Sequence, residues 1–180
     1  PLPNDYAPRT PMRIVISLAT ALVLVLPGHA AQAPPITAPV FDGLLGRWEG
    51  RGTILGQEAR VAAEWTAVLE RRFFRLSWTS AIGTAPARAF EGHAYYRIET
   101  PERMSATWYD STGQIRPIDA SVQAGSLVAR WGTPETEVGE TTYHVDAAGR
   151  LEVIDRVRGR NGEWREFGRS VLTRTGAAGR

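Results

Sequence analysis

The sequence Gly46-Arg47-Trp48-Glu49-Gly50-Arg51-Gly52-Thr53-Ile54 alternates between two kinds of residue. Glycine or apolar residues occupy every second position, and Arg, Glu or Thr occupies the positions between them. Successive side chains of a β-strand point to opposite faces, so this alternation predicts a strand with one buried face. Glycines on the buried face let the strand bend sharply and let another strand approach closely, as closure of a barrel requires.

Similar short runs recur through the rest of the chain, separated by turn residues. Asn161-Gly162 is typical of a type I′ hairpin, and no amphipathic helix longer than two turns is predicted. The pattern predicts an all-β fold of roughly ten strands, an antiparallel meander closed into a calycin-like barrel, because closure removes exposed strand edges. An open two-layered sandwich is the alternative. The further strands are expected at about 58–68, 72–80, 89–98, 104–110, 115–122, 126–131, 140–146, 151–157 and 163–173.

The opening of this barrel carries a family resemblance. Leu44-Leu45-Gly46-Arg47-Trp48-Glu49-Gly50 resembles the start of the calycin superfamily, which contains lipocalins, fatty-acid-binding proteins and nitrobindin-like barrels. Trp108-Tyr109-Asp110 is similar to a mid-barrel motif of small exported lipocalin-like proteins. The resemblance implies structural roles for Gly46 and Trp48, with an Arg of the last strand packed across the Trp. Arg165, Arg169 and Arg174 are the candidates, and Arg169 is the one we assign to barrel closure.

The last strand departs from the ligand sets of these families. Nitrobindin-like haem barrels use a His near the C-terminus, and fatty-acid-binding proteins use an Arg-x-Tyr pair. The run Trp164-Arg165-Glu166-Phe167-Gly168-Arg169-Ser170-Val171 has neither. We therefore expect no cofactor, and in particular no tight binding of haem.

The N-terminal residues have the pattern of an export signal. Met12-Arg13 precedes an apolar run over 14–26 that is shorter than the roughly 20 residues of a membrane-spanning helix, and small residues follow it. We expect residues 1–11 to lie upstream of the true start, 12–30 to be a signal peptide, 31–40 a linker and 41–176 the barrel. Cleavage would leave no stable membrane insertion, and an uncleaved anchor is the alternative. The chain has no Cys, which suits a protein secreted into a bacterial periplasm without disulfides.

Composition excludes several classes of function. The net charge is only +2 and no basic run is present, which argues against nucleic acid as a partner. Without Cys there is no thiol nucleophile or thiolate metal site, and the spacing of the His residues matches no zinc motif. No nucleophile elbow, phosphate loop or dinucleotide fingerprint occurs, so no catalytic set is predicted.

The candidate ligand-binding residues are those that the alternation places inside, together with polar residues near them. Carboxylates at Asp110, Asp119 and Asp155 are expected to face inward, where each must be paired or hydrated. These carboxylates could form a structural network with arginines, or they could provide a polar contact for a ligand, and the sequence leaves both interpretations open. The predicted ligand-binding residues are Trp65, Arg75, Tyr96, Trp108, Asp119, Trp131 and His144.

These features predict an exported, non-catalytic barrel that binds a small hydrophobic or amphipathic ligand. The first alternative is an enzyme that uses the inward carboxylates for acid/base chemistry, with Asp119, Asp155 and His144 as its candidate groups. The second is a structural envelope protein whose barrel is filled by side chains.

Overall fold

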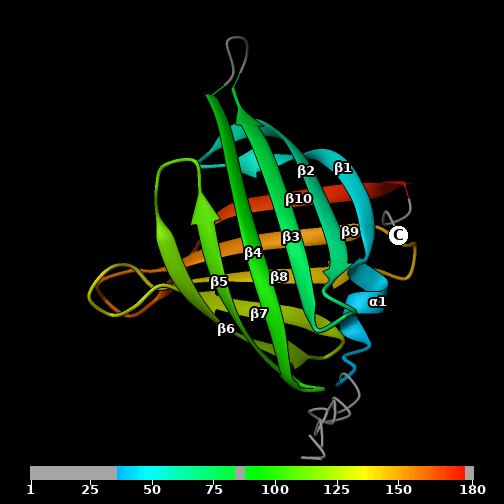
Figure 1. The fold of residues 1–180 in the computed structure, drawn as a ribbon. Helices are drawn as coiled ribbons and strands as arrows, with labels where there is room; N and C mark the ends of the chain where they lie inside the picture. The colour runs from blue at the N-terminus through cyan, green and yellow to red at the C-terminus, as the bar shows by residue number, and fades with distance from the viewer. Residues whose placement is uncertain (1–35, 84–87, 177–180) are drawn as a thin grey trace, which may run out of the picture. The chain divides into compact units, whose positions relative to one another are not determined.

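The chain forms a closed barrel of ten antiparallel strands in a computed structural model that describes residues 36–83 and 88–176 (Figure 1). Each strand pairs with its neighbours in sequence, and the first strand pairs with the last. One short helix, α1 (Val40–Leu44), precedes the barrel. The strands are β1 (Gly46–Ile54), β2 (Gln57–Val68), β3 (Phe73–Ile82), β4 (Arg88–Thr100), β5 (Arg103–Asp110), β6 (Ile115–Gln123), β7 (Ser126–Trp131), β8 (Gly139–Val145), β9 (Leu151–Arg158) and β10 (Trp164–Gly176).

The predicted all-β class, the antiparallel meander and the closure into a barrel are therefore confirmed. The predicted signal peptide over 12–30 and the first half of the predicted linker lie outside the described residues. Ala38, in the second half of that linker, is only 4% exposed and belongs to the core. The packed part of the chain thus begins before residue 41, the expected boundary.

Closure of the barrel depends on two glycines of β1. A Cβ atom added at Gly50 would lie 2.1 Å from the carbonyl oxygen of Val171, and one at Gly52 would lie 2.1 Å from that of Arg169. Both carbonyls belong to β10, the strand that closes the barrel against β1. No side chain fits between two backbones at this distance, so glycine is required where β1 bends against β10.

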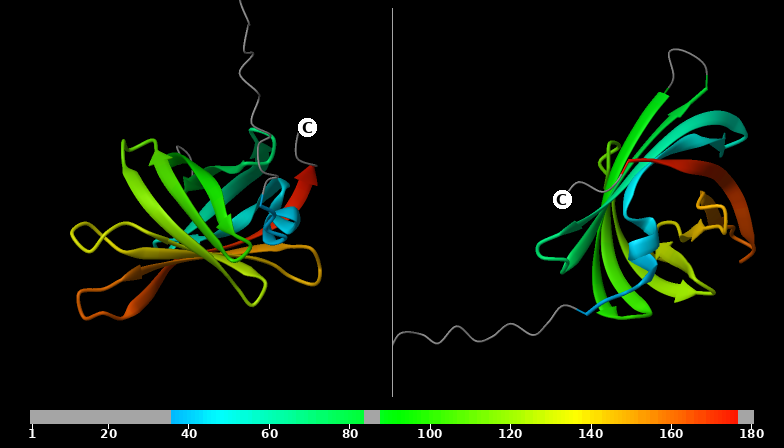
Figure 2. Two further views of the ribbon diagram at one scale, coloured as in Figure 1. Left: turned by 60° about the horizontal axis from the view of Figure 1, so that its bottom comes forward. Right: turned by 90° about the vertical axis from the view of Figure 1, so that its right-hand side faces the viewer.

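The alternating connections give the barrel two different ends. The β2–β3, β4–β5, β6–β7 and β8–β9 turns lie at the end that α1 packs against, which we call the helix end (Figure 2). The β1–β2, β5–β6, β7–β8 and β9–β10 connections lie at the opposite end, together with the end of β3 and the start of β4. The chain therefore presents different side chains at the two ends of the same barrel.

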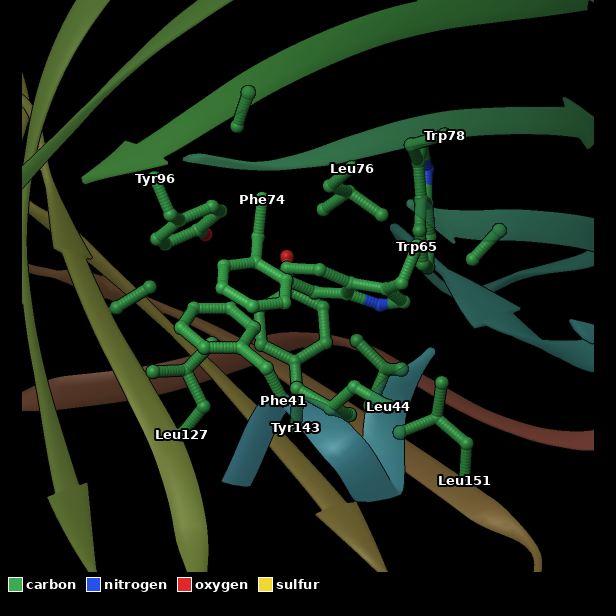
Figure 3. Close-up of a cluster of buried hydrophobic side chains, with 14 of the residues drawn as sticks. Phe41, Leu44, Trp65, Phe74, Leu76, Trp78, Tyr96, Leu127, Tyr143 and Leu151 are labelled. Atoms are coloured by element: carbon green, nitrogen blue, oxygen red, sulfur yellow. The ribbon is translucent and has the colours of Figure 1, made fainter. Parts of the chain in front are cut away.

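Aromatic side chains fill the helix end. Phe41 of α1 is fully buried and stacks on Phe74 with 4.2 Å between ring centroids. Trp65 lies 5.2 Å from Tyr143 in an edge-to-face contact and 5.3 Å from Tyr96. Figure 3 shows these rings converging on one another above α1. Such pairs add to the free energy gained from burial, so this end is a packed core.

Trp48 fixes the start of β1 to the end of α1. Its side chain is fully buried, and its Nε1 donates a hydrogen bond of 2.7 Å to the carbonyl oxygen of Leu44. Arg174, its direct partner on β10, lies over the Trp48 ring with 4.1 Å from the guanidinium carbon to the ring centroid. The same guanidinium donates to the carbonyl oxygens of Leu45 and Gly43.

The assignment of Arg169 to barrel closure is wrong, and Arg174 holds that place. Arg169 lies between Gly168 and Ser170, which are both buried, so its own side chain points outward. There it pairs with Glu166 and Glu152. The resemblance implied that an Arg of the last strand packs across Trp48, but only the register of β10 against β1 selects which one.

We expect Arg174→Ala to lower the free energy of unfolding by about 2 kcal/mol, because it removes a cation–π contact and two charged hydrogen bonds that join β10 to Gly43 of α1 and to Leu45. Urea unfolding followed by circular dichroism measures this. Arg169→Ala is the matched control and should cost less than about 1 kcal/mol, since exposed ion pairs contribute little. Equal losses in the two variants would contradict the assignment.

Candidate functional site

A cavity of about 470 Å³ occupies the end of the barrel opposite α1. We call this the cavity end. Its volume lies within the range of pockets that hold small ligands. The rim includes exposed residues such as Leu55 and Gln114, so the cavity reaches the surface. Its aromatic walls are Trp78, Phe90, Trp108, Trp131 and Phe167.

Two tryptophans of these walls lie directly against glycines of neighbouring strands. A Cβ atom added at Gly92 would lie 2.0 Å from Cζ2 of Trp108, and one at Gly139 would lie 1.9 Å from Cζ2 of Trp131. The two indoles therefore occupy space that any other residue at these glycines would fill. Phe90 stacks on Trp108 with 6.2 Å between centroids, which supports that wall from one side.

Trp108 is held by a carboxylate at the rim. Its Nε1 donates a 3.0 Å hydrogen bond to Oδ2 of Asp110, while Oδ1 of Asp110 accepts from the backbone and hydroxyl of Thr112. Partial burial opposes ionisation of Asp110, but hydrogen bonds from Thr112 and Trp108 outweigh it and lower the pKa of this carboxyl. Asp110 is thus a charged group that ties the β5–β6 turn to the cavity wall.

Trp131 is connected through the Thr141 hydroxyl to a second carboxyl group, that of Asp155. Its Nε1 donates to the hydroxyl of Thr141 at 3.1 Å, and that hydroxyl donates to Oδ1 of Asp155 at 2.7 Å. Burial raises the pKa of Asp155 to about 6, with Thr141 acting in the opposite direction and the charge of Glu166 adding to the rise. No arginine within the described ranges pairs with Asp155. The cavity therefore contains a carboxyl group that changes its charge close to neutral pH.

One arginine also lines the cavity. The guanidinium carbon of Arg116 lies 4.9 Å from the centroid of the Trp131 ring, and its Nη1 lies 3.3 Å from Oε2 of Glu137. This cation is therefore already neutralised by Glu137 and stacked on the wall. It leaves Asp110 and Asp155 without an arginine partner among the described residues.

The structure divides the four predicted aromatic residues between the two ends. Trp108 and Trp131 line the cavity, as expected. Trp65 and Tyr96 face the interior too, but they belong to the filled cluster at the helix end and do not line the cavity. Alternation along a strand indicates that a residue points inward without indicating which end of the barrel it reaches.

The three predicted polar residues lie on the outside of the barrel, contrary to the expectation that they face the interior or its rim. Asp119 has a side chain that is 75% exposed and pairs with Arg103. His144 follows the buried Tyr143, points outward and makes a 3.0 Å hydrogen bond to the Ser126 hydroxyl. Arg75 lies between buried neighbours on β3 and so points away from the interior as well.

The misplacement of Asp119 has a clear physical cause. Asp119 shares a face of β6 with the apolar Ile115, and this alternation predicts an inward position, but Ile115 is 66% exposed. The interior face of β6 instead carries Ile118 and Ala120, both buried. Apolar residues occur on both faces of this strand, so its pattern does not identify the buried one.

Several cavity residues were not predicted. Phe167 sits at a β-bulge, where the register of β10 against β9 shifts between Glu166 and Gly168. The extra residue brings Phe167 into the cavity wall, 6.4 Å from Trp131. Phe90 could have been found, because it shares its strand face with Tyr96, which was assigned to the interior. Trp78 lies on the face of β3 opposite to Arg75, the residue of this strand that was predicted to bind the ligand.

The described part of the chain contains no group of three or more His, Asp or Glu side chains arranged to hold a metal ion. Its only helix, α1, is too short to cross a membrane.

Comparison with known proteins gives the fold and no family. No family model matches the sequence, and no curated protein matches it. The chain is similar in fold to Rv2717c from M. tuberculosis. The two structures superpose with a TM-score of 0.57 over 77% of this chain and 98% of Rv2717c, at 17% sequence identity. The S-type phycobiliprotein lyase CPES from Guillardia theta gives a TM-score of 0.56 over 76% of this chain and 90% of the lyase, at 10% identity.

Proposed function

We propose that the chain is an exported, non-catalytic protein that binds a small, flat, amphipathic molecule in the cavity. The observation that carries this proposal is the cavity with its two tryptophans fixed against glycines. Walls of this kind present preformed aromatic faces, and the nearby carboxyl groups supply a small number of polar contacts, which together are typical of ligand sites. Fold similarity at 10–17% identity adds no ligand, so the proposal rests on the cavity.

The cavity also argues against the alternative of a barrel filled by side chains. The helix end is filled, but about 470 Å³ remains at the other end. A purely structural barrel would gain stability by closing this space with larger side chains. Ser80, which lines the cavity and is buried, is a small residue at a position where a larger one would do so.

A second candidate function is acid/base catalysis on a bound molecule. The observation that favours it is Asp155, a cavity carboxyl group whose pKa burial raises to about 6. General acids and bases are tuned in this way. Turnover of a bound molecule that disappears in Asp155→Asn would support catalysis. Asp119, which lies outside the barrel, is no longer a candidate for this role.

Three tricyclic probes of similar size test the binding proposal: neutral acridone, the proflavine cation and anthracene carboxylate. We expect at least one to bind saturably, as measured by probe fluorescence, and Trp131→Ala to weaken that binding about tenfold through loss of an aromatic wall. Trp164→Ala is the control, since Trp164 does not line the cavity. Failure of all three probes to bind, or equal weakening by both substitutions, would overturn the proposal.

A further inference from the structure

We propose that the ligand of the cavity is a cation, namely a flat aromatic molecule whose protonated nitrogen donates a hydrogen bond to the carboxylate of Asp155. This inference rests on the proposed function and specifies the chemical class of the ligand. It follows from the balance of charge in the cavity, the free oxygen of Asp155 and the way in which the cavity already holds one planar cation.

The cavity has an excess of acidic groups. Among the described residues that line it, Asp110, Glu137 and Asp155 are acidic and Arg116 alone is basic. Arg116 pairs with Glu137, and the hydrogen-bond donors of Asp110 are all neutral. Two carboxyl groups therefore remain without a cation among the described residues. A cationic ligand would supply the missing charge, whereas an anionic ligand would be repelled.

One oxygen of Asp155 is available to such a ligand. Oδ1 accepts the hydrogen bond from Thr141, while no donor to Oδ2 is found in the described part of the chain. Oδ2 faces Gly168, where an added Cβ atom would lie only 2.9 Å away. The glycine after the β10 bulge thus leaves Oδ2 uncovered by a side chain. A carboxylate oxygen of this kind accepts strongly from a charged N–H.

The stacking of Arg116 shows that the wall accepts a planar cation. Its guanidinium lies 4.9 Å from the centroid of Trp131, within the range of a cation–π contact. Trp108 provides a second indole in the same cavity, and the hydrogen bonds of both indoles run toward carboxyl groups. A delocalised organic cation would meet the same combination of aromatic face and nearby negative charge.

The other groups around Asp155 do not provide this partner. Tyr143 and Thr141 of β8 contribute neutral hydroxyls, and Glu166 of β10 contributes a further negative charge that is paired with Arg169. The other charged groups that are described in the cavity are Asp110 and the Arg116–Glu137 pair, of which Arg116 stacks on Trp131. Because the surroundings of Asp155 oppose its ionisation, an incoming cation would favour the ionised carboxylate and bind more weakly when Asp155 is protonated.

The same three probes test this inference on the full chain. We expect proflavine to bind at least about tenfold more tightly than acridone, and anthracene carboxylate to bind weakest, at about pH 7. The affinity for proflavine should fall about tenfold from pH 7 to pH 5, since its own charge persists and Asp155 gains a proton over this range. Asp155→Asn should remove both the preference for proflavine and its pH dependence.

Asp119→Asn provides the matched control, because the same substitution is made on an exposed carboxylate outside the barrel. It should leave the order of affinities unchanged. Binding of acridone as tight as that of proflavine, with no effect of Asp155→Asn on either, would overturn the cation inference and leave the binding proposal standing. Absence of binding by any probe would overturn both. Thermal unfolding of each variant confirms that it is folded before its affinities are compared.

Discussion

Replacing Gly50 with alanine is expected to lower the free energy of unfolding by about 3 kcal/mol or more, enough to leave a large fraction of the chain unfolded. The new Cβ atom would lie 2.1 Å from the carbonyl oxygen of Val171 and 2.8 Å from Cα of Leu172. Both are backbone atoms of β10, so no change of rotamer relieves the overlap. The strands must separate, and the ladder between β1 and β10 is the one that closes the barrel.

Urea unfolding followed by circular dichroism measures this loss, and the amount of folded protein at zero denaturant gives a second reading. Gly43→Ala is the control, since an added Cβ atom there has no neighbour within 4 Å and Gly43 lies in α1. In a helix this substitution is neutral or stabilising by up to about 1 kcal/mol. A Gly50→Ala variant that is as stable as the wild type would show that β1 and β10 do not approach each other as described.

Asp155→Asn is expected to stabilise the protein at neutral pH and to do so less and less as the pH falls. The pKa of Asp155 is raised to about 6 in the folded protein, against about 3.9 for an unperturbed Asp in the unfolded chain. The folded state therefore binds the proton more tightly. The stability that this provides is fully present below about pH 4 and is lost as the pH rises through about 6, by about 3 kcal/mol in total.

The measurement is the difference in unfolding free energy between Asp155→Asn and the wild type, determined at several pH values from about 4 to 8. The difference should grow in favour of the variant by about 3 kcal/mol over this range, because asparagine does not ionise. Asp119→Asn should give a small difference that stays flat, since its carboxylate is exposed. A flat difference for Asp155→Asn would contradict the raised pKa.

The fold was predictable because each strand can be recognised from its own local sequence. Period-two alternation and short turns placed each of the ten strands near its observed bounds, and the glycines of β1 indicated where the barrel closes. Both signals arise from neighbours in sequence. They require no knowledge of how distant strands pack, and a meander joins each strand to the next, so the topology followed directly.

The site was less predictable because it depends on register and on the two ends of the barrel. Alternation identified Trp108 and Trp131 as inward but did not separate them from Trp65, which lies among the rings near α1. The β-bulge that brings Phe167 into the cavity wall cannot be recognised from the alternation pattern. Asp119 was misplaced because β6 has apolar residues on both faces. Each of these errors concerns an arrangement fixed by strands far apart in sequence.

The separation of a filled end from a hollow end has a consequence for how such a barrel can change. Binding sites commonly lower the stability of the protein that contains them, because their residues are chosen for the ligand and not for packing. Here the ring cluster around Phe41 and Trp65 stabilises the fold at one end, and the cavity lies at the other. Under the proposed function, substitutions at the cavity end can therefore alter which molecule binds while the packing that maintains the barrel stays unchanged.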